Sequence, residues 1–83
     1  MHYRNGREAK NGDRVVQIDP STGRITGVGV LFDAEPGNDY CNGRIAPTLG
    51  GFVVGACMID CIHADDIIAV LAEKGLDKRP AGK

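Results

Sequence analysis

Aromatic residues are scarce in this sequence, which has no tryptophan, two tyrosines and two phenylalanines among its 83 residues. A core built from this chain must therefore consist mainly of Val, Ile, Leu, Ala and Met side chains. The chain also lacks a row of aromatic rings on which single-stranded nucleic acid could stack. This scarcity argues against one common way in which small β domains bind DNA or RNA.

Long apolar runs are missing as well. The longest run, residues 52–59, is far shorter than the roughly 20 residues that cross a bilayer as a helix. The basic start of the chain is not followed by an apolar stretch, so no secretory signal is predicted. Three cysteines are an odd number and a poor basis for a secreted disulfide framework. We therefore expect a cytoplasmic protein with reduced thiols and no contact with a membrane.

The length allows one domain and is too short for two. At this size a core is small, and a disulfide, a metal or a second subunit often adds stability. The net charge is −1, but it is unevenly distributed. Residues 1–14 and 73–83 each carry four basic and two acidic residues, whereas residues 15–72 carry two basic and seven acidic ones. An acidic body argues against a phosphate-binding surface, so nucleic acid is not the expected partner.

Turn signals rich in glycine recur along the chain and separate short apolar segments, a pattern typical of compact antiparallel β structure. The expected strands cover residues 14–18, 24–32, 43–46 and 52–59. In the second strand, Gly27 and Gly29 predict a strong bend that lets one strand serve both halves of a barrel. The fourth is apolar on both faces and is expected at the centre of the sheet. The residues predicted to be largely buried are Val16, Ile18, Ile25, Val28, Val30, Val54, Ile59 and Leu71.

Residues 64–74 carry apolar side chains at helical spacing, with Ile67, Val70 and Leu71 on one stripe. Two aspartates in the first turn, a lysine in the last and Gly75 just beyond suit a helix dipole and a glycine C-cap. These signals predict a helix over residues 64–74. The competing interpretation is a turn at 63–66 followed by a last strand, Ile67–Leu71, that closes the barrel.

Three short segments carry a resemblance to a known fold family. They are Gly12-Asp13-Arg14-Val15 entering a strand, the glycine-kinked strand Gly27–Phe32, and His63-Ala64-Asp65-Asp66-Ile67 near the close. Together they resemble small SH3-like barrels, and roughly residues 10–72 are similar to small prophage-associated bacterial proteins of this type. The helical pattern after Asp66 departs from the family's usual fifth strand.

The turn pattern and the resemblance together predict a mainly β fold, namely a small, antiparallel, partly open SH3-like barrel. The helical pattern of residues 64–74 adds a short C-terminal helix. We expect one domain over residues 1–77, followed by a disordered tail over residues 78–83.

One cluster of residues could carry chemistry. Cys57, Cys61 and His63 share one parity, so a strand running on to His63 would place all three on one face, and Cys41 could approach them. Such a set suits tetrahedral zinc, but only one pair has the close spacing of structural zinc sites. A Cys61–His63 nucleophile pair is disfavoured because residues i and i+2 of a strand lie about 6.5–7 Å apart. We therefore expect Cys57 and Cys61 to be buried thiols, with no metal, cofactor or catalytic residue.

The leading functional hypothesis is a non-catalytic protein-interaction module that binds an unknown protein partner or forms a weak homodimer. Its support is that SH3-like barrels commonly bind through loops and edge strands, which is an analogy of fold. The alternatives are a small nucleic-acid-binding barrel and a zinc- or thiol-dependent activity at Cys57, Cys61 and His63.

Overall fold

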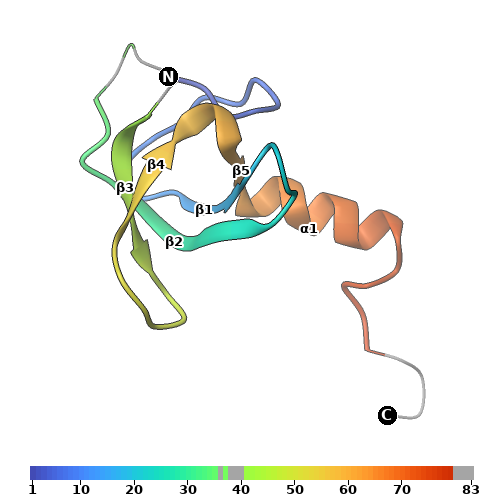
Figure 1. The fold of residues 1–83 in the computed structure, drawn as a ribbon. Helices are drawn as coiled ribbons and strands as arrows, with labels where there is room; N and C mark the ends of the chain where they lie inside the picture. Colours follow the sequence, from blue (N-terminus) through green and yellow to red (C-terminus); the bar gives the residue numbers. More distant parts are fainter. Residues whose placement is uncertain (36, 38–40, 80–83) are drawn as a thin grey trace.

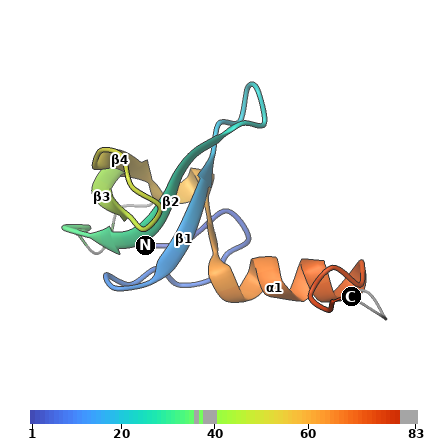
Figure 2. The ribbon, with the colours of Figure 1, turned by 90° about the horizontal axis from the view of Figure 1, so that it is seen from below.

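The computed structural model describes residues 1–35, 37 and 41–79. Its elements are β1 (Arg14–Ile18), β2 (Ile25–Phe32), β3 (Cys41–Pro47), β4 (Val54–Cys57), the 3₁₀ helix η1 (Met58–Asp60), β5 (Cys61–His63) and α1 (Ala64–Glu73) (Figure 1). The strands pair antiparallel in the order β4-β3-β2-β1-β5. They curl into a half-barrel from which α1 projects, as Figures 1 and 2 show. The predicted mainly β fold, an antiparallel, partly open barrel with a short C-terminal helix, is confirmed.

The strand boundaries agree with the prediction in the first half of the chain and differ in the second. β1 and β2 lie within the predicted ranges, and β3 extends beyond 43–46 at both ends. The single strand predicted over 52–59 is wrong, because β4 stops at Cys57 and η1 then turns the chain into β5. No glycine or proline marks the break at Met58, so this apolar run could not reveal it.

The predicted C-terminal helix is confirmed as α1, and the competing final strand Ile67–Leu71 is wrong. The helix ends at a glycine C-cap, since Gly75 has a φ of 70° and its N–H donates to the carbonyl of Ala72. The N–H of Leu76 donates in turn to the carbonyl of Leu71. Within the described part of the chain, no helix is long and apolar enough to cross a membrane. Of the tail predicted to be disordered, only residues 78 and 79 are described.

The core lies inside the curl of the sheet, and the face of β1 that contacts it is the opposite of the predicted one. Val15 and Gln17 are buried, and strand alternation therefore directs Val16 and Ile18 outward. Since Val15 and Val16 are both apolar, the sequence pattern could not tell the inner face of β1 from the outer one. The buried apolar residues are Tyr3, Ala9, Val15, Leu31, Ala34, Ile45, Ala56, Met58 and Cys61.

The predicted core residues are therefore corrected. Ile25 and Ile59 are exposed, and the other six are only partly buried, namely Val16, Ile18, Val28, Val30, Val54 and Leu71.

β2 is the strand shared by the two halves of the sheet, as predicted. It pairs with β1 along most of its length and with β3 from Gly29 onward. At Gly29 the neighbouring strand comes so close that a Cβ atom would overlap the carbonyl oxygen of Ala46. Only glycine fits there, so the close approach of β3 to β2 depends on this residue.

The side chain of Gln17 joins β1 to the edge strand β4, and these two strands do not pair with each other. Its Nε2 donates to the carbonyl of Gly55 at 3.0 Å, and its Oε1 accepts from the N–H of Cys57 at 2.7 Å. Both partners lie on β4, whereas Gln17 lies on β1 near the other end of the sheet. One buried amide thus satisfies two backbone groups on β4, the edge strand of the sheet that the described residues form.

The N-terminal segment covers one end of the half-barrel. Residues 1–9 form a tight turn in which Tyr3 and Ala9 reach the core, and the N–H of Arg4 donates to the carbonyl of Cys61 on β5. In Figure 1 this segment lies at one end of the barrel and the turn between β3 and β4 at the other.

A pair of glycine substitutions tests the strand spacing. Gly29→Ala should lower the free energy of unfolding by about 3 kcal/mol or more, because the added methyl group meets backbone that cannot move aside. Gly55→Ala is the matched control on β4, since an added Cβ there meets nothing within 4 Å. Its effect on denaturant-induced unfolding should stay within about 0.5 kcal/mol. Equal effects at both positions would contradict this packing.

A substitution of Gln17 tests the closure of the half-barrel. Gln17→Met keeps the size of the side chain but leaves the Gly55 carbonyl and the Cys57 N–H without their partner. Denaturant unfolding should show a loss of roughly 2–4 kcal/mol, at about 1–3 kcal/mol for each unsatisfied buried group. Arg14→Met on the same strand, at an exposed position, is the control and should change little. If Gln17→Met were neutral, the amide would not close the barrel.

Candidate functional site

The candidate cysteine–histidine cluster is not assembled among the side chains that the structure describes. Because η1 interrupts the strand, Cys57 ends β4 while Cys61 and His63 lie on β5. Their shared odd numbering therefore no longer places the three side chains on one strand face. Across residues 1–35, 37 and 41–79, no group of three or more His, Cys, Asp or Glu side chains is arranged to hold a metal ion. The prediction that the protein carries no zinc stays a prediction, with elemental analysis as its measurement.

The two described cysteines differ from each other. Cys57 is partly buried and disulfide-bonded, so the predicted buried thiol is wrong at this position. Its backbone partner in the β3–β4 register is Cys41, whose side chain lies outside what the structure describes. Cys61 is fully buried and free, as predicted.

Burial, reinforced by the negative charge of Asp60, raises the pKa of Cys61 from 9.0 to about 11. A thiol of this kind is protonated at neutral pH and is a poor nucleophile. Its Sγ lies 3.9 Å from Oε1 of Gln17, within the core and away from solvent.

His63 serves as the N-cap of α1. Its Nδ1 accepts a hydrogen bond from the backbone N–H of Asp65 at 3.0 Å, so in the neutral ring the proton lies on Nε2. Nε2 faces Oδ1 of Asp13 at 3.7 Å. Neither nitrogen therefore offers a lone pair to a substrate, which removes His63 as a general base in this arrangement.

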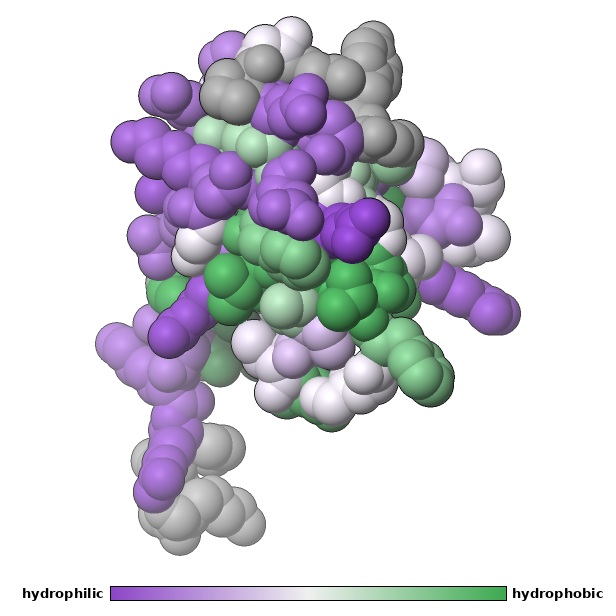
Figure 3. Space-filling view, turned by 90° about the vertical axis from the view of Figure 1, so that its left-hand side faces the viewer, coloured by the Kyte–Doolittle hydropathy of each residue, from purple (hydrophilic) through white to green (hydrophobic). Residues whose placement is uncertain are grey.

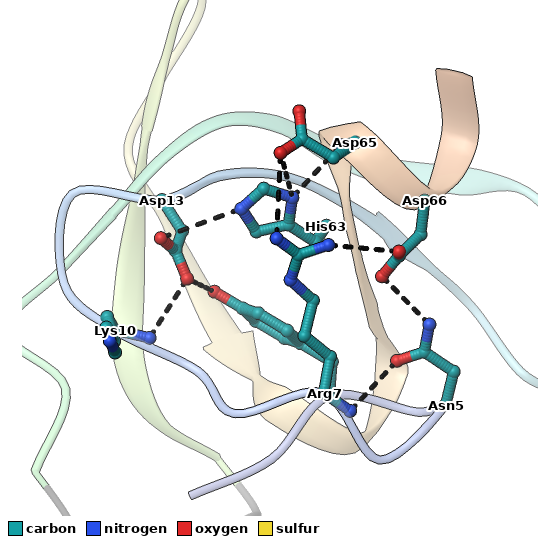
Figure 4. A network of polar contacts seen from close by, with 8 residues as sticks. Asn5, Arg7, Lys10, Asp13, His63, Asp65 and Asp66 are labelled. Carbon is teal, nitrogen blue, oxygen red and sulfur yellow. Dashed lines mark hydrogen bonds and ion pairs between the residues drawn. The ribbon is translucent and has the colours of Figure 1, made fainter. Parts of the chain in front are cut away.

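Around His63 lies a polar cluster formed by the N-terminal segment, the start of β1 and the start of α1 (Figure 4). The hydroxyl of Tyr3 donates to Asp13 at 2.6 Å, and the backbone N–H of Lys10 donates to the same carboxylate at 3.0 Å. Arg7 reaches Asp66 at 3.0 Å and Asp65 at 3.6 Å. The cluster connects the N-terminal segment to the start of α1, which is far from it in the sequence.

The titration behaviour of this cluster fits a structural role. Burial and the hydrogen bond to Asp13 raise the pKa of Tyr3 well above its usual range, so the phenol stays a donor. Hydrogen bonds from Asn5 and Arg7 lower the pKa of the Asp66 carboxyl. The phenol of Tyr3 and the carboxylate of Asp66 are thus each held in the form that binds its neighbours. The cluster fastens the N-terminal segment to α1.

A second site, which the sequence did not suggest, lies at the end of the half-barrel opposite the N-terminal segment. It is an apolar groove of about 320 Å³ between the first half of β2 and the turn of residues 48–53. Ile45 and Val54 form its floor, and Ile25, Leu49 and Phe52 stand at its rim. Leu49 is 85% exposed and Phe52 is 89% exposed, so both large side chains lie in solvent.

Figure 3 shows a face on which apolar residues gather below a broad hydrophilic region. The groove and its rim include no charged residue. Gly27 keeps the floor open, because a Cβ atom there would lie 2.9 Å from Cγ2 of Val54. Exposed apolar side chains around a hollow are typical of binding surfaces. The available signal in the sequence was the pair Gly50-Gly51 between Leu49 and Phe52, since apolar residues beside a tight turn have little chance of burial.

The ionisation of Cys61 predicts an alkaline loss of stability. Its pKa is higher in the folded chain than in the unfolded one, so its contribution is fully present below pH 9 and is lost as pH rises through about 11. Over this window the free energy of unfolding of Cys61→Ala should fall by about 2–3 kcal/mol less than that of the wild type. Denaturant unfolding at successive pH values measures both. Tyr3 titrates in both proteins, and only the smallest contribution to its raised pKa, the charge of Cys61, differs between them. Parallel pH profiles would contradict the burial of the thiol.

Comparison of the chain with protein-family models, with curated proteins and with solved structures finds no match. Any functional proposal therefore has to come from the residues of the chain itself.

Proposed function

We propose that the protein is a non-catalytic protein-interaction module that binds an apolar segment of another protein in the groove at Ile25, Leu49 and Phe52. The observation that carries the proposal is the exposure of Leu49 and Phe52 beside a preformed apolar hollow. Two large apolar side chains that lie in water in the free protein would be removed from water by a bound ligand, and their burial favours binding. The size of the groove, at the lower end of the range of about 300–1,000 Å³ for ligand pockets, suits a few side chains rather than a folded domain.

The strength of binding follows from the same residues. Burial of one such side chain contributes about 1.5–3 kcal/mol. A micromolar complex needs about 8 kcal/mol after the costs of association are met. Leu49, Phe52 and Ile25 together supply about 4.5–9 kcal/mol before those costs, which is less than a micromolar complex requires. The proposed interaction is therefore weak and transient.

The shape of β2 favours an extended segment as the ligand. The pairing of β2 with β3 ends at a hydrogen bond from the N–H of Thr48 to the carbonyl of Val28, at 3.2 Å. From Val28 back to Ile25, β2 is paired with β1 on one side only, among the described strands. The open side borders the groove, so an extended peptide can add backbone hydrogen bonds to the apolar contacts.

Nucleic acid is a less suitable ligand because the basic N-terminal segment already has acidic partners. Arg4 lies 3.7 Å from Asp60, and Arg7 pairs with Asp65 and Asp66. These arginines are thereby neutralised within the chain and are not available to phosphates. The buried Cys61 and the capping His63 likewise give no support to a thiol-dependent activity.

The biological setting is proposed from the resemblance alone. From that resemblance we propose that the protein is a small SH3-like barrel encoded by a phage or mobile element in a bacterium. A cytoplasmic location stays a prediction, and it no longer has the support of three reduced thiols, because Cys57 is disulfide-bonded.

Selection from a random peptide library on the immobilised full chain tests the proposal. Selected peptides should be apolar and extended, and Phe52→Asp should weaken their binding at least tenfold in fluorescence polarisation, since it places a charge at the rim of the groove. Ile68→Asp is the matched control, because Ile68 is an exposed apolar residue on α1 and should leave peptide binding unchanged.

Peptides that bind Phe52→Asp as well as the wild type would refute the groove as the site. A parallel titration of labelled single-stranded DNA and RNA at physiological salt should show no tight binding. Submicromolar affinity for either, retained after removal of residues 78–83, would replace the proposal with nucleic-acid binding.

A further inference from the structure

Three Asn-Gly pairs occur in the chain, namely Asn5-Gly6, Asn11-Gly12 and Asn42-Gly43. Asparagine followed by glycine is prone to spontaneous deamidation, because glycine has no side chain to hinder attack by its backbone nitrogen on the asparagine Cγ. The attack forms an N–Cγ bond, passes the N–H proton to solvent and expels the side-chain amide as ammonia. Water then opens the resulting succinimide ring to aspartate or isoaspartate, so no oxidant or other co-reactant is needed. How fast each pair reacts depends on how firmly the fold holds it.

Two of the three pairs are held by the sheet. The side chain of Asn11 is bonded at both ends to the backbone of Ala34, with its Nδ2 donating at 3.0 Å and its Oδ1 accepting at 2.9 Å. The N–H of Gly12 donates to the carbonyl of Leu31 on β2 at 2.7 Å. Asn42 lies within β3, between β4 and β2. Deamidation requires the side chain to turn onto the next backbone nitrogen, so at both positions the chain must first separate from the sheet.

Asn5 is held instead by exposed contacts of the N-terminal segment and α1 (Figure 4). Its Nδ2 donates to Oδ2 of Asp66 at 2.9 Å, and its Oδ1 accepts from the N–H of Arg7 at 3.1 Å. The N–H of Gly6 donates to the carbonyl of Tyr3 at 2.9 Å, within the segment itself. None of these partners lies in the sheet. Local opening of such a surface segment requires less free energy than opening of paired strands, so the fold protects Asn5 least of the three.

The surroundings of Asn5 make its amide group important. Deamidation replaces the Nδ2 donor by a carboxylate oxygen that faces Oδ2 of Asp66. The hydrogen bonds from Asn5 and Arg7 lower the pKa of Asp66, so this neighbour is negatively charged at neutral pH. Like charges at hydrogen-bond distance repel each other. Arg7 already pairs with Asp65 and Asp66, and after the reaction one guanidinium would face three carboxylates. The cluster thus loses a bond and gains a repulsion in a single step.

We propose that Asn5 is a site of spontaneous deamidation, and that the modification releases the N-terminal segment from α1. The intact amide bridges the segment to Asp66, and the carboxylate that replaces it pushes the two apart. The attachment of the segment is therefore limited in time by a slow and irreversible reaction of the chain with water. This reaction needs no ligand and does not involve the groove at Phe52, so it is independent of the peptide binding proposed above.

Peptide mapping by mass spectrometry tests the site, on the full chain kept in mildly alkaline buffer with and without denaturant. In denaturant the three pairs should react at similar rates, because they share the same dipeptide. In the folded protein Asn5 should react at least tenfold faster than Asn11 or Asn42. Asp66→Ala should speed the reaction at Asn5 several-fold and leave Asn11 unchanged. Reaction of Asn11 or Asn42 before Asn5, or equal rates at all three in the folded protein, would overturn the proposal.

Amide hydrogen exchange tests the release. In Asn5→Asp, the N–H of Arg4 that donates to the carbonyl of Cys61 should exchange several-fold faster than in the wild type. Combining Asn5→Asp with Asp66→Asn exchanges the amide and the carboxylate, and should restore the wild-type rate. Thr22→Asp is the control, because it adds the same charge on the exposed turn between β1 and β2 and should change nothing at Arg4. An unchanged rate in Asn5→Asp, or no recovery in the double variant, would overturn the proposed release.

Discussion

The amide of Gln17 makes contacts that a further strand would make in a closed barrel. It reaches from β1 to the carbonyl of Gly55 and the N–H of Cys57, and so ties β1 to the edge strand β4 across the open sheet. The curl of the sheet, the burial of Met58 and Cys61 beneath it, and the position of β4 all depend on that contact. A polar residue in the centre of a small core is costly unless both halves of its amide are satisfied, as they are here.

Closure by one side chain leaves the half-barrel with unequal ends and two apolar faces. The N-terminal segment covers one end through Tyr3 and Ala9, and the other end stays open as the groove. The inner face forms the core, whereas the outer face and α1 lie in partial contact with water. In a chain of 83 residues the core is too small to absorb every apolar side chain, and the excess is placed at these sites.

The sequence predicted the parts of the fold that local chemistry determines. Turn residues marked β1 and β2, and the acidic first turn with Gly75 marked α1. It did not predict the inward face of β1, because Val15 and Val16 are equally apolar and Gln17 reads as a surface residue. The expected alignment of Cys57, Cys61 and His63 on one strand face is wrong for a related reason. That expectation assumed an unbroken strand. No turn residue near Met58 signals the break, which depends on the packing of the whole chain.

The groove was also beyond the reach of local signals. Leu49 and Phe52 are ordinary core residues by type, and only their place beside the Gly50-Gly51 turn hints at exposure. Their surroundings include residues 25–28 of β2, which lie more than 20 residues earlier in the chain. A pocket formed by segments so far apart depends on the register of the whole sheet.

The direct junction of β5 and α1 has a mechanical consequence. β5 pairs with β1 over three residues, and it continues into the helix without a linker. A force on α1 therefore acts on β5 as a lever and peels it from β1. The bonds of Arg4 to Cys61 and of Arg7 to Asp66 oppose that motion from the N-terminal side. The first nine residues, β5 and α1 thus open and close as one cooperative unit, in which amide protons should exchange together and faster than those of β2 and β3.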